Sequence, residues 1–337
     1  MQGLPLIIIC LLGMLSLGAL IVLRFWYQRV PVPEQIRDPK LLHILIRDTG
    51  EYSLEHTREL FDRLHDLIKW HNSIVSLELI AGAYGMHVIA VTEERIAVEL
   101  HDLFAQFYPD AAIDNVGDYT SSVHTTHKLM STAEFGLKRE FAYPVRRFDE
   151  FSHDPLGAVF AVLQNVTLPN EFWLQLVLRP APDTWKPAAR KMIGNTELAH
   201  ERMNRVEQKL QQKGFQFIVR GLVKSDNFNV AGSYFQDLAD AFGMFDSPDL
   251  NSIAQKKQGR PDISDLLRHL LVGRTLYERT DEVTRYEHRV LDHLSEDVIT
   301  PSELAGLWHV PDIDNPVELT PGGTELMIAP GHDLQEL

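Results

Sequence analysis

The sequence has almost no cysteine. Its 337 residues include one, Cys10, which lies inside an apolar run near the N-terminus. Without a second cysteine the chain forms no internal disulfide, and it offers no thiol outside that run for catalysis or for a metal site. The sequence therefore excludes a disulfide-stabilised secreted scaffold and is compatible with the cytosol.

Motifs of nucleotide-binding and hydrolytic enzymes are missing as well. No glycine is followed by lysine, so the phosphate-binding loop G-x-x-x-x-G-K-[ST] does not occur. The patterns G-x-S-x-G, H-E-x-x-H and G-x-G-x-x-G are also absent. These absences exclude a P-loop nucleotide hydrolase, and we expect a chain that is not an enzyme and that uses no cofactor.

Positive charge is in short supply. The chain has 32 Lys and Arg against 47 Asp and Glu, a formal net charge of −15. A surface this acidic repels the phosphate backbone that supplies most non-specific nucleic-acid affinity. Trp173, Phe215 and Phe217 fall at strand positions, where aromatic side chains belong to a core more often than to a base-stacking surface. We therefore expect no direct contact with nucleic acid.

The sequence does have an uncharged apolar run at residues 4–23. As a helix it would span about 30 Å, the thickness of the hydrocarbon core of a bilayer. Phe25-Trp26-Tyr27 follows at once, with Arg24 and Arg29 as basic flanks. A cleaved signal peptide is the alternative, but it would begin with a basic region, and no Lys or Arg precedes this run. The pattern predicts a single-pass helix in a bacterial inner membrane, with the N-terminus outside and the soluble domains in the cytoplasm.

From residue 41 onward the hydrophobic period switches repeatedly between that of a strand and that of a helix. Strands are expected at 41–46, 75–79, 86–91 and 111–116, with helices beginning at Ser53 and Thr92. The resulting order, β-α-β-β-α-β, is typical of a ferredoxin-like unit. A second copy is expected, with strands at 141–145, 171–178, 215–223 and 250–255, helices at 155–166 and 229–242, and a charged helix inserted at 197–213.

The sequence thus predicts an α+β fold in which an N-terminal transmembrane helix precedes two ferredoxin-like (βαββαβ) units. The second unit carries a helical insertion, and a helix and an acidic, proline-rich tail follow it. The predicted boundaries are 1–29 for the anchor, 30–40 for a linker, 41–118 for the first unit, 119–138 for a linker loop, 139–258 for the second unit, 259–295 for a helical segment and 296–337 for the tail.

Two histidines in the predicted linker loop give an alternative reading. His124-x-x-His127, with Asp118 upstream, has a spacing that fits a metal site, but such a site needs a third or fourth ligand. Whether the pair binds a metal stays open. A membrane-tethered hydrolase that uses histidines and carboxylates is one alternative function, and a nucleic-acid-binding module on exposed sheet faces is another.

The tail contains one compact apolar cluster, at Leu304, Leu307, Trp308 and Val310. A disordered acidic segment has no physical need for such a cluster. Ser302 is placed to cap a short helix that Pro311 would end. We predict that these side chains form a docking segment, which binds either to the second unit of its own chain or to a partner protein.

Three segments resemble a known class of protein. They are Arg146–Phe151 with Asp154-Pro155-Leu156, then Phe172–Pro180, then Ser302–Pro311. In this order they resemble the membrane-proximal module upstream of the motor in bacterial type IV secretion and conjugation ATPases of the DNA-coupling kind. They are also similar to stand-alone proteins of an uncharacterised domain family that accompany those ATPases.

The resemblance spans roughly residues 41–311 and implies a partner. It implies a membrane-anchored, non-enzymatic scaffold of a type IV secretion or conjugative DNA-transfer apparatus, which docks a separate P-loop ATPase. The ATPase motor itself is absent from this chain, so its residues have no counterpart here. The sequence leaves open the cargo and the formation of a homo-oligomer.

Overall fold

The computed structural model describes residues 34–46, 53–82, 85–120, 129–194, 199–259, 282–291 and 297–309. The first half of the fold contains β1 (Pro39–Ile46), α2 (Leu54–His71), β2 (Val75–Gly82), β3 (Gly85–Glu93), η1 (Glu94–Ile96), α3 (Ala97–Phe107) and β4 (Ala111–Val116). The second half contains β5 (Leu129–Leu137), η3 (Phe148–Glu150), α4 (Gly157–Gln164), β6 (Glu171–Pro180), α5 (Trp185–Ile193), α6 (His200–Gln211), β7 (Phe215–Ser225), α7 (Phe228–Phe242), η4 (Gly243–Phe245) and β8 (Ile253–Gly259). The last described elements are α10 (Glu282–Glu287), β9 (Val298–Ile299) and α11 (Pro301–Leu307).

The strands form one antiparallel sheet of nine strands. Its order is β4-β1-β3-β2-β6-β7-β5-β8, and the short β9 pairs with β7 beside this path. Each half of the sheet has the same internal order, in which its fourth, first, third and second strands follow one another. Strands β2 and β6, the second strand of each half, meet in the middle of the sheet.

The β2–β6 pairing is the seam between the halves. The two strands run antiparallel from Val75 opposite Leu178 to Ala81 opposite Phe172. Each would otherwise be an edge with unpaired backbone N–H and C=O groups. Both strands are buried along almost their whole length, which explains why their sequences are apolar with few interruptions.

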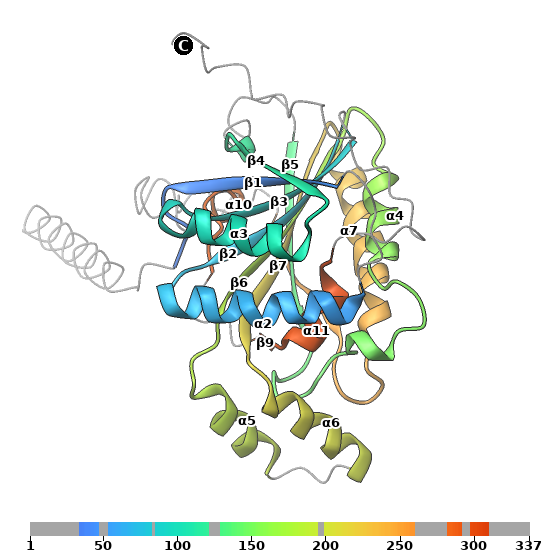
Figure 1. Cartoon of the computed structure of the whole chain (residues 1–337). Coiled ribbons are helices and arrows are strands. Elements are labelled where there is room, and N and C mark those ends of the chain that lie inside the picture. The colour runs from blue at the N-terminus through green and yellow to red at the C-terminus, as the bar shows by residue number, and fades with distance from the viewer. Residues whose placement is uncertain are drawn as a thin grey trace, which may run out of the picture.

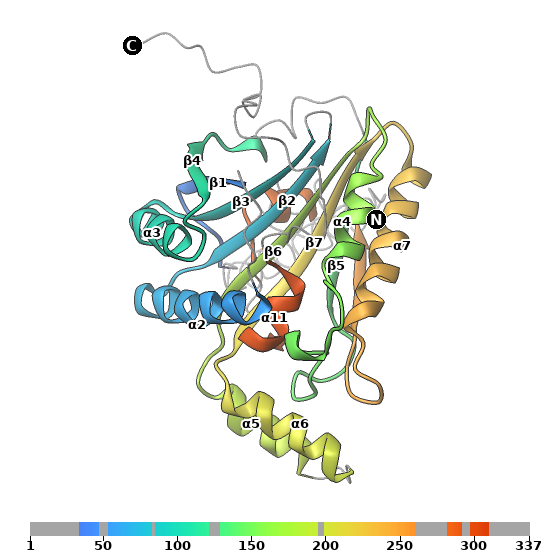
Figure 2. The same cartoon turned by 45° about the vertical axis from the view of Figure 1, so that its right-hand side comes forward.

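Helices cover one face of the sheet. Helices α2 and α3 lie over the first half, α4 and α7 lie over the second, and α11 lies between the two groups (Figures 1 and 2). Helix α10 lies on the opposite face of the sheet (Figure 1). Because side chains alternate along a strand, Leu77 and Leu79 of β2 face the helices while Glu78 faces the other way.

Helix α11 fills the gap between the two groups of helices. It begins with Pro301 and is capped by reciprocal hydrogen bonds between Thr300 and Glu303. Trp308, which ends the helix, is 2% exposed and packs edge-on against Phe61 of α2 and Phe104 of α3, at centroid distances of 6.2 and 5.9 Å. The helix therefore links the helical layer of the first half to that of the second.

The predicted fold class, localisation and membrane partner need correction. Within the described residues no helix is long and apolar enough to cross a bilayer. Helix α2 has 18 residues, but its outward face carries charged side chains such as Glu59 and Arg63. The predicted span at residues 4–23 lies outside the described residues. The two predicted units are also not separate bodies, since β2 and β6 join them into one sheet.

The first strand of the second half was also placed wrongly. It was predicted at 141–145 after a linker loop at 119–138, whereas β5 occupies Leu129–Leu137. Ser131, Thr132 and Glu134 made this segment look like a loop, but all three are buried within the sheet. The Glu134 carboxylate accepts a hydrogen bond there from Arg220 at 2.7 Å, so the strand tolerates its charge.

Replacing Trp308 tests the role of α11. Trp308→Ala removes a buried ring between α2 and α3, and we expect the free energy of unfolding to fall by about 3–5 kcal/mol. Trp70→Ala is the matched control, because Trp70 is 85% exposed and its loss should change stability by less than about 0.5 kcal/mol. Urea unfolding of both variants would measure the difference, and equal stabilities would show that α11 does not hold the halves together.

Candidate functional site

A row of polar side chains crosses the sheet on the face opposite the helices. Glu78 of β2 lies opposite Gln175 of β6, Gln175 lies opposite Arg220 of β7, and Arg220 lies opposite Glu134 of β5. Gln175 donates to Glu78 at 2.8 Å and Arg220 donates to Glu134 at 2.7 Å. The row thus connects the two halves through the hydrogen bond between Gln175 and Glu78, which crosses the seam.

Arg289 packs over the Glu78 end of this row. Its guanidinium donates to Glu78 at 3.1 Å and to Asp118 at 2.6 and 3.0 Å, while Tyr119 donates its hydroxyl to Glu78 at 2.7 Å. Arg289 has a positive φ of 51°, an uncommon backbone angle for a residue with a side chain. From this backbone position the guanidinium donates to both carboxylates. These hydrogen bonds offset the conformational free energy of the positive φ.

Burial and neighbouring charges shift the pKa values of Asp118, Tyr119 and Tyr286 in this cluster. Burial alone would raise the pKa of the Asp118 carboxyl, but the hydrogen bonds and charge of Arg289 hold it below its ordinary value. Burial and the charge of Glu78 raise the pKa of Tyr119 and Tyr286 well above the usual range. Both hydroxyls therefore stay protonated near neutral pH and serve as hydrogen-bond donors rather than as bases.

A pair of histidines lies further along the same face. His87 Nδ1 and His43 Nε2 are 3.2 Å apart, and both side chains are buried. Burial, reinforced by the charge of His87, lowers the pKa of His43 to about 4 even though Asp114 opposes the shift. Burial also lowers the pKa of His87. One ring must donate and the other accept, so the pair fits a neutral hydrogen bond.

These groups form a structural network. Glu78, Arg220 and Arg289 are each at most 1% exposed, so a substrate has no access to them from solvent. Among the residues with described positions, no group of three or more His, Cys, Asp or Glu could hold a metal ion. His124 and His127 lie outside the described residues. Trp173, Phe215 and Phe217 are buried, so they present no stacking surface to a nucleic acid.

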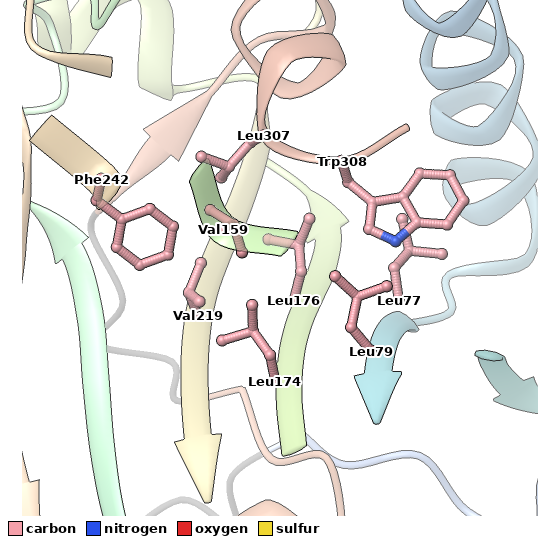
Figure 3. A pocket seen from close by; sticks show the side chains of 9 residues that line it. All are labelled: Leu77, Leu79, Val159, Leu174, Leu176, Val219, Phe242, Leu307 and Trp308. Atoms are coloured by element: carbon pink, nitrogen blue, oxygen red, sulfur yellow. The ribbon is translucent and has the colours of Figure 1, made fainter. Parts of the chain in front are cut away.

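The predicted docking residues lie inside the molecule. Leu304, Leu307 and Trp308 are buried against the chain's own helices and sheet, and Val310 lies outside the described residues. Leu307 and Trp308 border an apolar cavity at the seam, of about 20 Å³, together with Leu77 and Leu176 (Figure 3). A space of this size holds no more than about one water molecule, so it is a packing defect and not a ligand site.

The α5–α6 hairpin, which we call the arm, projects beyond the end of the sheet (Figures 1 and 2). Its inner faces meet in a small core that includes Trp185, Ala189 and Leu210. Lys209 of α6 donates to Glu303 of α11 at 3.1 Å, and both side chains are only 1% exposed. This buried ion pair fixes the base of the arm to α11.

An exposed tryptophan lies near the base of the arm. Trp70, in the last turn of α2, is 85% exposed. On one side of it in the chain, Lys69 pairs with Asp183, just before the arm, at 2.8 Å; on the other, His71 pairs with Glu99 at 3.0 Å. An open hollow of about 460 Å³ borders this corner, lined in part by Lys69 and Asp183. We call Trp70 and this hollow the arm corner.

The helical spacing of apolar residues in the sequence already places Trp70 on the exposed side of α2. The buried face of α2 is formed by Phe61, Leu64 and Ile68, which recur at helical spacing. At 100° per residue Trp70 lies about 200° from Ile68, on the opposite side of the helix. An aromatic residue on the polar side of an amphipathic helix points to an interaction surface.

Loss of Arg289 tests the buried network. Arg289→Ala leaves Glu78 and Asp118 without their cation, and we expect a loss of about 3–5 kcal/mol in the free energy of unfolding. Arg58→Ala, in a surface cluster with Glu55 and Asp62, is the control and should cost no more than about 1 kcal/mol. In the Arg289→Ala background, Glu78→Gln should recover part of the loss. Additive losses in urea unfolding would show that the two groups act independently.

Acid sensitivity tests the histidine pair. The unfolded chain protonates His43 below about pH 6.5, whereas the folded chain does so only below about 4. Stability should therefore fall as the pH drops through this window, by up to about 3 kcal/mol from His43, and level off below it. His43→Gln should flatten the slope measured by urea unfolding, with the surface variant His101→Gln as control. An unchanged slope in His43→Gln would contradict the assignment.

Part of the chain is similar to a known sequence family. Residues 81–201 match the model of a domain of unknown function, DUF8128. The match runs from the end of β2 through β6 and α5 to the start of α6, so it includes one strand of the seam and part of both halves. It covers less than half of the chain. No curated protein matches the chain.

Solved structures that match the chain weakly include oxidases. A glycopeptide hexose oxidase bound to teicoplanin matches with 11% identity and a TM-score of 0.34, covering 77% of this chain and 54% of that one. Berberine bridge enzyme from Eschscholzia californica matches with 9% identity and a TM-score of 0.26, covering 64% of this chain and 42% of that one. The chain thus spans about half the length of these structures, and likenesses this low carry neither their fold nor their chemistry to it.

Proposed function

We propose that this protein is a non-enzymatic docking component that binds a separate P-loop ATPase through the arm corner. The observation that carries the proposal is Trp70, a large aromatic side chain that is 85% exposed on an otherwise polar helix surface. Tryptophan is the residue most enriched among those that dominate protein–protein binding energy. An exposed tryptophan beside an open hollow is suited to a protein partner that covers both.

The distribution of charged groups supports a docking role. In the described part of the chain, buried ion pairs join Arg289 to Glu78 and Arg220 to Glu134 on the sheet, and Lys209 of the arm to Glu303 of α11. They stabilise the sheet and hold the arm in place. The rigid scaffold that results can present Trp70 and the arm in a fixed geometry, which lowers the entropic cost of binding.

The identity of the partner rests on the sequence resemblance. Two of the segments that carry it, Phe172–Pro180 and Ser302–Pro311, include β6 and α11, which are core elements of the fold. The proteins that these segments resemble are ATPases of type IV secretion or conjugation. In this proposal the motor is a separate chain that binds in trans.

Affinity capture tests this function. The tagged full chain should recover a P-loop ATPase of that class from extracts of its native cell, and Trp70→Ala should weaken binding of the purified ATPase by about 30-fold. Leu168→Ala is the matched control, because Leu168 is also an exposed apolar residue, 63% exposed, on the other half of the fold. Recovery of no ATPase, or an equal effect of both variants, would overturn the proposal.

A further inference from the structure

The outer face of α5 is basic. Lys186 and Arg190 lie four residues apart and so share one side of the helix, and Lys191 lies next to Arg190. The helix contains no acidic residue, while Trp185, Ala189 and Ile193 form its buried side. The face carries three positive charges in a chain whose net charge is −15.

Most other Lys and Arg side chains in the described structure form an ion pair with a carboxylate. Arg58, Arg147, Arg202 and Arg205 all have a carboxylate within 3 Å. In the described residues, by contrast, no carboxylate forms an ion pair with Lys186, Arg190 or Lys191. Like charges one helical turn apart repel each other and destabilise the helix. Within the described residues the repulsion between these cations is therefore not relieved by an ion pair.

Helix electrostatics account for only part of the cluster. Arg190 and Lys191 lie in the last turn, where the helix dipole favours positive charge. Lys186 lies in the first turn, where the dipole disfavours it. Partial burial, together with the charges of Arg190 and Lys69, lowers the pKa of Lys186 despite the opposing charge of Asp183. Positive charge is thus concentrated at this end of the arm beyond what the helix requires.

We infer that the outer face of α5 binds an acidic segment of a partner protein. The inference deepens the proposed function and rests on it for the partner's location, because Lys69 and Asp183 join the arm corner to the start of α5. Lys186 and Arg190 are spaced for carboxylates four residues apart on a helix of the partner. Exclusion of water over such a contact strengthens each ion pair.

A protein segment fits this face better than a nucleic acid. The cations extend over little more than one helical turn, about 5–8 Å, whereas a nucleic acid needs neutralisation along a much longer backbone. The chain as a whole has a net charge of −15, which disfavours the approach of a long phosphate chain. A partner protein needs acidic residues only where it meets α5.

The test uses a defined probe and the full chain. The probe is a fluorescein-labelled helical peptide with glutamates four residues apart and leucines between them, and its glutamine analogue is the negative control. Fluorescence anisotropy should show binding of the glutamate peptide that weakens as salt rises. The triple variant Lys186→Glu, Arg190→Glu, Lys191→Glu should bind about tenfold more weakly.

A second triple variant separates a local surface from bulk charge. Lys40→Glu, Arg63→Glu and Lys138→Glu change the net charge by the same amount at exposed positions away from the arm. This variant should bind the peptide like the unmodified chain, and circular dichroism would verify that both variants are folded. Equal weakening by both triples, equal binding of the glutamine peptide, or tighter binding of single-stranded DNA would each overturn the inference.

The same variants distinguish this inference from the proposed function. If Trp70→Ala abolishes ATPase binding while the α5 triple binds both ATPase and peptide normally, the docking role stands and the basic face is not part of it. If the peptide binds through α5 but no ATPase is recovered, the surface exists and the partner has been misidentified. Loss of ATPase binding in both variants is the expected result.

Discussion

The antiparallel pairing of β2 with β6 is the interaction on which the rest of the structure depends. It joins two halves of the same strand order into a single sheet, and it satisfies the backbone groups of two strands that would otherwise be edges. Neither half would bury its apolar surface as fully alone, because α11 packs over the middle of the sheet and contacts both groups of helices. Pairing at the seam therefore also creates the site at which the C-terminal segments bind.

The chain's last described segments stabilise this seam on both faces. On one face Arg289 joins Glu78 to Asp118, and the backbone carbonyl of Tyr286 accepts a hydrogen bond from Gln175. On the other face α11 inserts Trp308 between α2 and α3. The first contact is polar and the second apolar, because alternate residues of the same strands point to opposite sides of the sheet. Segments distant in sequence thus meet at the same strands.

The arm and α11 are connected by one buried ion pair, Lys209 with Glu303. Burial lowers the pKa of Lys209, while the charge of Glu303 and its hydrogen bond favour the protonated form. Glu303 also accepts hydrogen bonds from the backbone of Val145 and Thr300, so its carboxylate has several donors. Separating the two partners would leave each charge buried without its counter-ion, which is unfavourable. The ion pair therefore constrains the arm to one position relative to the sheet. A fixed arm holds α5 and the neighbouring arm corner in a constant arrangement for a partner.

The sequence by itself determined most of the local structure. Hydrophobic periodicity located β1, α2, β2, β3, α3 and β6 closely, and composition excluded P-loop and thiol chemistry. It failed at β5, where Ser131, Thr132 and Glu134 looked like loop residues because their hydrogen-bond partners come from distant strands. Such partners leave no trace in local sequence. The joining of the two halves was hidden for the same reason, since β2 and β6 lie about 95 residues apart and a pattern read along one strand does not name its neighbour.

Only the tertiary structure decided which exposed residues form a surface. The apolar cluster at Leu304, Leu307 and Trp308 was predicted to dock onto the second unit or onto a partner, and its burial between α2, α3 and the sheet follows from the seam. The sequence places Trp70 and the cations of α5 on separate helices, and the pair Lys69–Asp183 brings the end of α2 to the base of the arm. Periodicity reports whether a side chain faces a core, whereas the position of one element beside another depends on long-range packing.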